Sequence, residues 1–180
     1  MPAMIEIRAA HTADLDAATL RAARALLDAV FEDRMTDDDW DHALGGIHAL
    51  VWEEGQLIGH ASVVQRRLLH NGRALRAGYV EAVAVRGDRR RRGYGAASME
   101  VVERVIRGAY DLGALGASTE GAGLYQARGW KQWQGPTLAL TPDGIRRTRE
   151  EDGSIYVLPV GADLDLFSEL VCDWRDGEVW

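Results

Sequence analysis

Glu81 is the one charged side chain within the apolar run YVEAVAV, residues 79–85. Burying a carboxylate in such a strand is unfavourable unless the group has a partner or a function. One function is general-base catalysis, in which the carboxylate takes a proton from a reacting amine. A strand-edge glutamate paired with an arginine such as Arg76 would explain the same residue. The sequence leaves both interpretations open.

Four arginines and two glycines follow this strand in the run RRRRGYG, residues 89–95. Gly93 and Gly95 remove side chains where the backbone must approach another group closely. The helix expected behind them offers unpaired N–H groups and the positive end of its dipole. These features favour a phosphate site over a solvated charge run. A nucleic-acid patch is disfavoured, because the chain has a net charge of −7 and such binders are normally basic.

Several other chemistries lack their sequence patterns. The Walker pattern GxxxxGK[ST], GxGxxG, HExxH, GxSxG and Cys/His clusters are all absent. Cys172 is the only cysteine and has no evident histidine partner, which argues against a covalent acyl-enzyme and agrees with a reducing compartment. No apolar run approaches the ~18 residues that span a bilayer. We therefore expect a soluble, cytoplasmic protein with no metal and no nucleic-acid or membrane partner.

The length of 180 residues and the 47% hydrophobic content fit a single domain with a sizeable core. Thr36 and Asp39 have the spacing of a helix capping box. The first half is expected to contain a strand at 5–9, helices at about 14–30 and 37–44, and an antiparallel meander that ends in a strand at 73–85. An amphipathic helix is expected after the arginine run, followed by a strand at 112–118 and a short helix ended by Gly129. The remaining elements are one strand in WKQWQGPTLAL, a charged loop at 141–153 and a last strand at 154–160.

The hexapeptide Arg90-Arg91-Arg92-Gly93-Tyr94-Gly95 resembles the Arg/Gln-x-x-Gly-x-Gly/Ala signature of the GCN5-related N-acetyltransferases (GNAT). WDHALGGIHALVW, QRRLLHNGRALRAGYVEAVAVR, RGAYDLGAL, LYQARGW and CDWRDGEVW together resemble the aminoglycoside 2′-N-acetyltransferases of that superfamily. The resemblance implies a GNAT fold of the α/β (α+β) class, with a mixed central sheet, an antiparallel meander, splayed strands and flanking helices. It also implies one domain over residues 1–180, with a C-terminal tail that contributes to the acceptor site.

The same resemblance implies acetyl-CoA as co-substrate, an aminoglycoside or other polyamine-like acceptor, and a homodimer. Glu81 then corresponds to a base acting through water, and Tyr125 in LYQARGW to the acid that protonates the departing thiolate. Without the resemblance, Tyr125 would be interpreted as a core tyrosine. The groups expected to hold the cofactor are the backbones of Ala82, Val83 and Val85 at the pantetheine arm, and the loop residues Arg90, Arg91, Arg92, Gly93, Tyr94, Gly95 and Ala96 at the pyrophosphate.

Carboxylates are expected to hold a polycationic acceptor. The candidate acceptor ligands are Asp39, Glu81, Glu151, Asp152, Glu178 and the α-carboxylate of Trp180. Asp39 has an alternative role, since carboxylates stabilise a helix N-terminus, and a solvated loop would explain Glu151 and Asp152 equally well. The aromatic terminus predicts a docked chain end.

Two departures from the family pattern, Arg34 and the segment GALGAS, bear on which acceptor is preferred. The same chemistry on another amine, such as a cell-wall precursor, a polyamine or a protein N-terminus, is the alternative function. A CoA- or nucleotide-binding module without transferase activity is a third hypothesis. The presence of both Glu81 and Tyr125 beside a complete loop argues against that module.

Overall fold

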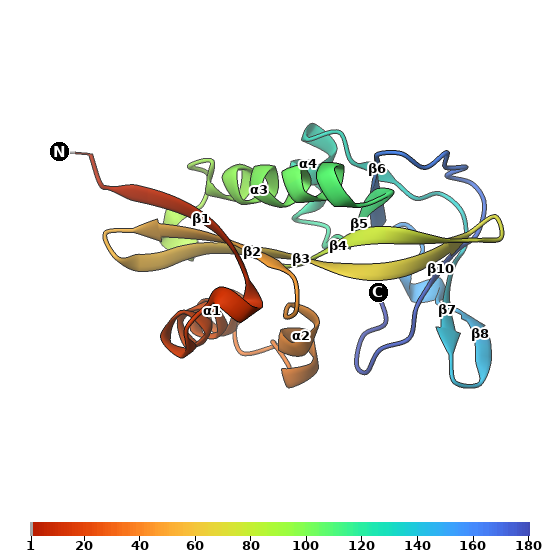
Figure 1. The fold of residues 1–180 in the computed structure, drawn as a ribbon, viewed down its shortest axis with the longest axis horizontal. Helices are drawn as coiled ribbons and strands as arrows, with labels where there is room; N and C mark the ends of the chain where they lie inside the picture. The colour runs from red at the N-terminus through yellow and green to blue at the C-terminus, as the bar shows by residue number, and fades with distance from the viewer. Residues whose placement is uncertain (1) are drawn as a thin grey trace. The chain divides into compact units, whose positions relative to one another are not determined.

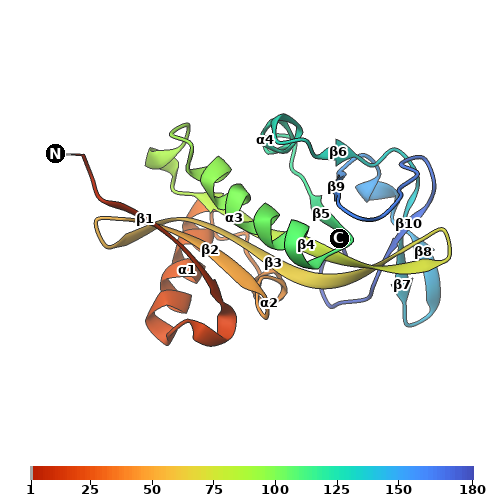
Figure 2. The same ribbon diagram turned by 45° about the horizontal axis from the view of Figure 1, so that its top comes forward.

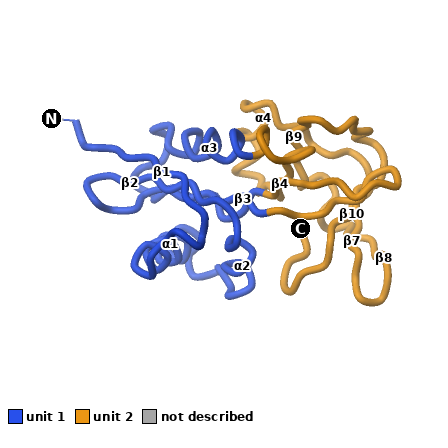
Figure 3. The backbone as a smooth tube through the Cα atoms, in the orientation of Figure 1, with its two compact units in different colours: residues 1–64, 80–105 blue, residues 65–79, 106–180 orange. Residues whose placement is uncertain are grey.

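The structure is a computed structural model that describes residues 2–180, and it divides the chain into two compact units (Figure 3). Of the described residues, unit 1 consists of 2–64 and 80–105, and unit 2 of 65–79 and 106–180. Three elements contribute residues to both units: strands β3 (Gln56–His70) and β4 (Arg73–Val85) and helix α3 (Tyr94–Ala109). The predicted bounds of β4 are confirmed.

Unit 1 contains strands β1 (Ile5–His11) and β2 (Ile47–Glu53), which pair antiparallel with each other. Strand β2 also pairs antiparallel with the first part of β3. Helices α1 (Ala17–Val30) and α2 (Asp37–His42) lie on one face of these strands, and α3 lies on the other (Figures 1 and 2). A core cluster fills the space under α1 with Leu15, Ala23, Leu26, Leu50 and Leu57.

The first two helices are shorter than expected, for local reasons. Helix α1 begins at Ala17 because Asp16 is its N-cap and accepts a hydrogen bond from the Thr19 backbone N–H at 2.7 Å. Thr36 and Asp39 form the predicted capping box at the start of α2. Helix α2 ends at His42, because the next backbone N–H groups, those of Ala43 and Leu44, donate to the carbonyls three residues before them instead of four. Gly45, with a left-handed φ, then turns the chain away.

Unit 2 contains helix α4 (Ala122–Ala127) and six further strands. The strands are β5 (Leu112–Gly116), β6 (Lys131–Gln132), β7 (Thr137–Thr141), β8 (Gly144–Arg147), β9 (Ile155–Pro159) and β10 (Leu170–Cys172). Their order with β3 and β4 is β6-β9-β5-β4-β3-β10-β7-β8. Strand β5 runs parallel to β4 and antiparallel to β9, while β10 runs antiparallel to β3 and parallel to β7. The predicted mixed sheet is confirmed.

The prediction of one strand in WKQWQGPTLAL is wrong, because the chain breaks between β6 and β7. The backbone N–H groups of Gln134 and Gly135 both donate to the Leu166 carbonyl rather than to a neighbouring strand. At Gly135 an added Cβ would lie 2.0 Å from the Ser168 carbonyl oxygen, so only glycine fits this crossing. Pro136 then lacks the N–H needed to continue a ladder.

The predicted charged loop at 141–153 is also corrected. Strand β8 pairs antiparallel with β7 through a tight turn in which Gly144 has a φ of 105°. All four residues of β8 are exposed, so the strand carries no alternation of apolar residues that the sequence could reveal. A short 3₁₀ turn, Arg149–Glu151, follows it. Within residues 2–180, no helix is long and apolar enough to cross a membrane.

Candidate active site

The loop between β4 and α3 has the backbone conformation of an anion site. Arg91 and Gly93 both have left-handed φ values, 59° and 85°. Alternating left-handed residues turn neighbouring backbone N–H groups toward a common point, which makes a concave anion site at the start of a helix. Arg90 to Arg92 are exposed around this loop. Gly95 lies inside the first turn of α3 rather than in the loop. The loop therefore fits a phosphate group.

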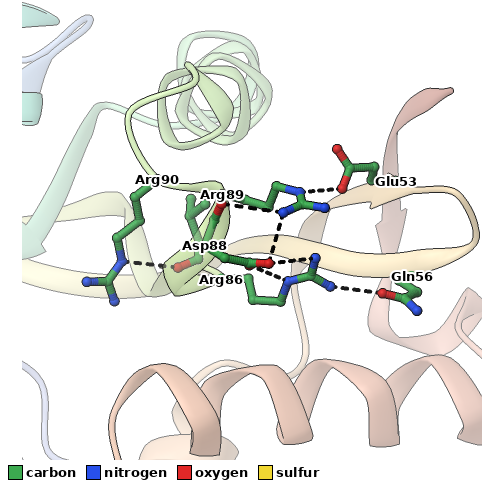
Figure 4. Close-up of polar contacts among 7 residues, drawn as sticks. Glu53, Gln56, Arg86, Asp88, Arg89 and Arg90 are labelled. Carbon is green, nitrogen blue, oxygen red and sulfur yellow. Dashed lines mark hydrogen bonds and ion pairs between the residues drawn. The ribbon is translucent and has the colours of Figure 1, made fainter. Parts of the chain in front are cut away.

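The arginine run divides into two parts with different roles. Arg89 points back into unit 1, where its Nε donates to Glu53 and its Nη1 donates to Asp88 Oδ2 at 2.9 Å (Figure 4). Arg86 donates to the other Asp88 oxygen at 2.7 Å. These contacts fix the turn after β4. Arg90–Arg92 are left as the exposed cations, so the run is neither a uniform surface patch nor wholly available to a ligand.

Glu81 lies beside an irregularity in β4. The next residue, Ala82, has a φ of 51°, which is uncommon for a residue with a Cβ and breaks the regular strand. Two buried side chains of β3 form hydrogen bonds to the backbone at this irregularity. His60 Nδ1 lies 2.8 Å from the Ala82 carbonyl oxygen, and Ser62 Oγ donates to the Glu81 carbonyl at 3.5 Å. The sequence does not link either side chain to Glu81 or Ala82, because both lie some twenty residues away in the chain, and His60 by itself is typical of a structural histidine.

Arg76, considered above as the structural partner of Glu81, has another partner. Its guanidinium lies 3.8 Å from an Asp111 carboxylate oxygen, and its backbone N–H donates to the other oxygen at 2.8 Å. Arg76 is therefore engaged by Asp111 within unit 2, and Glu81 is half-buried rather than fully buried.

Tyr125 lies on α4 in unit 2 with 7% of its surface exposed. Its ring packs against Trp130, with ring centres 6.3 Å apart. Burial raises the pKa of the Tyr125 phenol to about 12. At Gly121 an added Cβ would lie 3.2 Å from the Tyr125 ring, so this glycine leaves room for it. The phenol is thus held in place and fully protonated at neutral pH.

Trp180 is docked, as its aromatic side chain predicted. Trp180 is 6% exposed, and its Nε1 donates to Thr148 Oγ1 at 2.9 Å. The Thr148 hydroxyl in turn donates to Thr137 Oγ1 at 3.0 Å. This chain of bonds joins the last residue to β7 and fixes the position of the terminal residue within unit 2.

Arg66 of β3, which sequence analysis did not single out, secures the rest of the tail. Its Nε donates to Asp173 Oδ1 at 2.7 Å, and its Nη2 donates to the carbonyls of Asp173 at 3.0 Å and Val179 at 2.6 Å. The guanidinium also stacks over the Tyr79 ring at 4.6 Å. Because the side chain is 4% exposed, these contacts are shielded from water.

Asp152 is engaged by a cation of its own fold. Arg147 makes a two-point contact with its carboxylate, at 2.7 and 3.1 Å, and Thr137 Oγ1 donates to it at 2.8 Å. These bonds hold the pKa of Asp152 far below its ordinary value. The geometry gives Asp152 a role in anchoring the turn after β8 rather than in facing a ligand.

Glu151 has the opposite electrostatic setting. Burial, the nearby Glu178 and the adjacent Glu150 raise the pKa of Glu151. Unit 2 therefore holds two neighbouring carboxylates whose mutual repulsion an added cation would relieve.

We expect Glu151→Gln to stabilise the protein at neutral pH. A raised carboxyl pKa means that the folded state binds the proton more tightly, so stability is lost as the pH rises from the ordinary value of 4.5 through the folded-state pKa. The amide mimics the protonated form and removes that loss. Thermal melts at pH 4 and pH 7.5 should show a higher melting temperature for the variant only at pH 7.5. A lower melting temperature at pH 7.5 would contradict this electrostatic account.

Asp39 is half buried and serves the capping box of α2. Its side chain accepts a hydrogen bond from the Thr36 backbone N–H at 2.9 Å, and Thr36 Oγ1 accepts one from the Asp39 N–H. Asp37, its neighbour, pairs with Arg24. The geometry therefore supports the helix-end role for Asp39 that the sequence had left open.

The candidate residues are distributed over the two units. Unit 1 carries Asp39, Glu81 to Val85 and the loop of residues 90–96. Unit 2 carries Tyr125, Glu151, Asp152, Glu178 and Trp180. The structure thus brings the base candidate and the phosphate loop into one unit, and the acid candidate and the tail carboxylates into the other.

A strand–loop–helix anion site inside this mixed sheet is the pattern of an acetyltransferase of the GNAT class, and the sequence agrees. Residues 7–133 match the family described as the acetyltransferase (GNAT) domain, and the chain belongs to that family. GNAT acetyltransferases use acetyl-CoA. Over 177 residues, 96% of this chain and 91% of the relative, the chain is 54% identical to the aminoglycoside 2′-N-acetyltransferase of Mycolicibacterium fortuitum.

Solved structures show the same fold at much lower identity. Escherichia coli ElaA matches with a TM-score of 0.61 and 23% identity, over 87% of this chain and 99% of that one. A GNAT family acetyltransferase from Brucella melitensis, solved in complex with acetyl-CoA, matches with a TM-score of 0.61 and 16% identity, over 90% and 92% of the two chains. The expected GNAT fold is therefore confirmed.

Proposed function

We propose that this protein transfers the acetyl group of acetyl-CoA directly to the 2′-amino group of aminoglycosides. The observation that carries the proposal is the 54% identity, over nearly the whole chain, to an enzyme named for that reaction. The left-handed loop and the protonated, buried Tyr125 support it, since acetyl-CoA carries a pyrophosphate and its thiolate needs a proton when it departs. Cys172 is buried with a thiol pKa raised to about 11, which is unsuited to a covalent acetyl-cysteine.

The reaction needs a neutral amine and a stabilised oxyanion. An alkylammonium with a pKa of ~10 requires roughly 4 kcal/mol to deprotonate at pH 7, and the amines of an aminoglycoside require less because their pKa values are lower. We assign the proton transfer to Glu81 acting through water. The backbone N–H groups after Ala82 in β4 serve as donors to the thioester carbonyl as negative charge develops on its oxygen.

The leaving thiolate needs a proton, and we assign that proton to the Tyr125 hydroxyl. Its pKa of about 12 keeps the phenol in the acid form throughout the neutral range. For the acceptor, Glu151 and Glu178 supply negative charge in unit 2, and a polycation relieves the repulsion that raises the pKa of Glu151. This scheme does not use Asp39, which caps helix α2, or Asp152, whose carboxylate is bound by Arg147.

A matched pair of drugs tests the reaction. Kanamycin B carries an amine at C2′ and kanamycin A a hydroxyl at the same carbon. We expect purified protein to release CoA thiol from acetyl-CoA with kanamycin B and to release none above background with kanamycin A. Mass spectrometry should show one added acetyl group on the product. Equal rates with both drugs would place the acetyl group elsewhere, and release only with a polyamine or peptide amine would favour the alternative acceptor.

From the same relationship we infer a homodimer that acts in the cytoplasm. The buried, unpaired state of the single cysteine agrees with a reducing compartment.

A further inference from the structure

A line of hydrogen bonds runs through the interior of unit 1 and ends on the irregular residue of β4. Thr12 Oγ1 lies 2.7 Å from His48 Nε2, His48 Nδ1 lies 2.9 Å from His60 Nε2, and His60 Nδ1 lies 2.8 Å from the Ala82 carbonyl oxygen. Both imidazoles are fully buried. Ionisable side chains are rarely placed in a core without a satisfied network or a function.

The direction of every bond in this line follows from its last member. The Ala82 carbonyl can only accept, so His60 Nδ1 must carry the hydrogen. Burial lowers the pKa of both histidines to about 4, so at neutral pH each ring has one donor and one acceptor. His60 Nε2 therefore accepts from His48 Nδ1, and His48 Nε2 accepts from the Thr12 hydroxyl. Thr12 Oγ1 itself accepts from the Gly45 backbone N–H at 2.9 Å.

The line acts on a single peptide group. The peptide bond that joins Ala82 to Val83 is planar and trans, so its C=O and N–H point in opposite directions. Fixing the carbonyl toward His60 therefore fixes the Val83 N–H to point away from it. A donor on the carbonyl also polarises the peptide, and aligned donors strengthen one another along a chain of hydrogen bonds. The imidazole line thus makes the Val83 N–H both better oriented and a stronger donor.

We propose that His60, supported by His48 and Thr12, is a positioning residue for acetyl transfer that acts through the Ala82–Val83 peptide and aims the Val83 N–H at the thioester carbonyl. This inference rests on the proposed function. The Val83 N–H belongs to the backbone, so no substitution can remove it directly, but these side chains give a way to change its orientation. It also explains why Ala82 keeps a left-handed φ of 51°, a conformation that is unfavourable without an external hold.

A purely structural buried pair would predict a different outcome from the same substitutions. If the two histidines only satisfy each other in the core, removing one lowers stability and leaves the donor strength at the carbonyl unchanged. The test therefore needs a readout of the thioester itself. Infrared difference spectra of bound acetyl-CoA labelled with ¹³C at the carbonyl report it directly, because a hydrogen bond lowers the C=O stretching frequency.

Two variants separate the roles. His60→Leu removes the donor, whereas His60→Asn keeps an N–H near the position of Nδ1. We expect His60→Leu to return the thioester stretch toward its value in free acetyl-CoA and to lower kcat about tenfold, since losing a whole oxyanion donor costs about a hundredfold or more. His60→Asn should recover most of both. The acceptor KM should change by less than about twofold in either variant, because the proposed role of His60 concerns the thioester of acetyl-CoA and not the acceptor.

His70 provides the matched control. It is a buried histidine of unit 2 whose Nδ1 lies 3.2 Å from the Glu169 carbonyl, in the same arrangement as His60 and Ala82. His70→Leu should lower the melting temperature and leave the thioester stretch unchanged. A shift equal to that of His60→Leu would show that the spectrum reports general loosening, and this would overturn the proposal.

Different results would contradict the proposed function and the positioning role of His60. If the wild-type protein binds acetyl-CoA but acetylates no 2′-amine, the proposed function is wrong, and the infrared shift between wild type and His60→Leu still decides the role of His60. If His60→Leu is folded, binds acetyl-CoA and shows the wild-type stretch, the positioning role is wrong. If His60→Asn also folds with the same losses as His60→Leu, the donor hydrogen is not the feature that matters, and the proposal again fails.

Discussion

Replacing Tyr125 with phenylalanine is expected to lower kcat about a hundredfold or more while leaving the Kd for CoA nearly unchanged. The substitution removes one oxygen and keeps the ring that packs against Trp130 and Gly121. A thiol has a pKa of ~8.5, so the departing sulfur needs a proton at the moment the C–S bond breaks. Without the phenol, water must supply it. Steady-state kinetics with calorimetry of CoA binding separate the two effects.

The pH profile adds a second criterion for Tyr125. Because burial raises its pKa to about 12, the phenol stays protonated up to the strongly alkaline range. Loss of this acid therefore cannot lower kcat between about pH 7 and 10 in the wild-type enzyme. Any fall of kcat in that range belongs to another group, and Tyr125→Phe should leave the fall in place.

Tyr156→Phe is the appropriate control for Tyr125→Phe. Tyr156 is a buried tyrosine of β9, and its hydroxyl accepts a hydrogen bond from Gln126 of α4 at 3.2 Å. Losing this hydroxyl perturbs the same helix without removing the proposed acid. We expect a small change in stability and less than about a threefold change in kcat. Equal losses in both variants would assign the effect to packing of α4, and an unchanged kcat in Tyr125→Phe would remove Tyr125 as the acid.

The features that the sequence predicted correctly are those with a local cause. The capping box of α2 depends on Thr36 and Asp39 alone, and the bounds of β4 follow from a continuous apolar run after a tight turn. The left-handed backbone at Gly93 also has a local cause, because glycine permits that conformation. The roles of Glu81 and Tyr125 rest on the family resemblance, because no local pattern could assign them, and they stay predictions.

The features that the sequence missed depend on distant partners. The break before β7 exists because residues 134 and 135 bond to Leu166, and nothing in WKQWQGPTLAL records that contact. Arg66 appears as one of two arginines in a strand, and only the folded tail shows that it makes three bonds there. His60 gave the weakest signal, because a histidine in an apolar strand is indistinguishable from a packed core residue until the Ala82 carbonyl is located.

Glu81→Gln should lower kcat/KM by about a hundredfold or more near pH 6.5, with a smaller loss as the pH rises. The amide has the shape of the carboxylate but does not accept a proton from the amine. At low pH the acceptor amine is mostly protonated, so the reaction depends most on a base. At high pH the amine deprotonates in solution, and the advantage of Glu81 shrinks. The measurement is the ratio of wild-type to variant kcat/KM from about pH 6 to 9.

Glu103→Gln is the control that makes this ratio interpretable. Glu103 is a buried carboxylate of α3 in the same unit as Glu81, so the substitution removes a carboxylate from the same part of the protein. Its ratio to wild type should be the same at every pH, because the residue has no part in taking the proton from the acceptor. If Glu81→Gln also gave a ratio that does not change with pH, Glu81 would be a structural carboxylate, and the base would have to be sought among water molecules held by the irregular β4 backbone around Ala82.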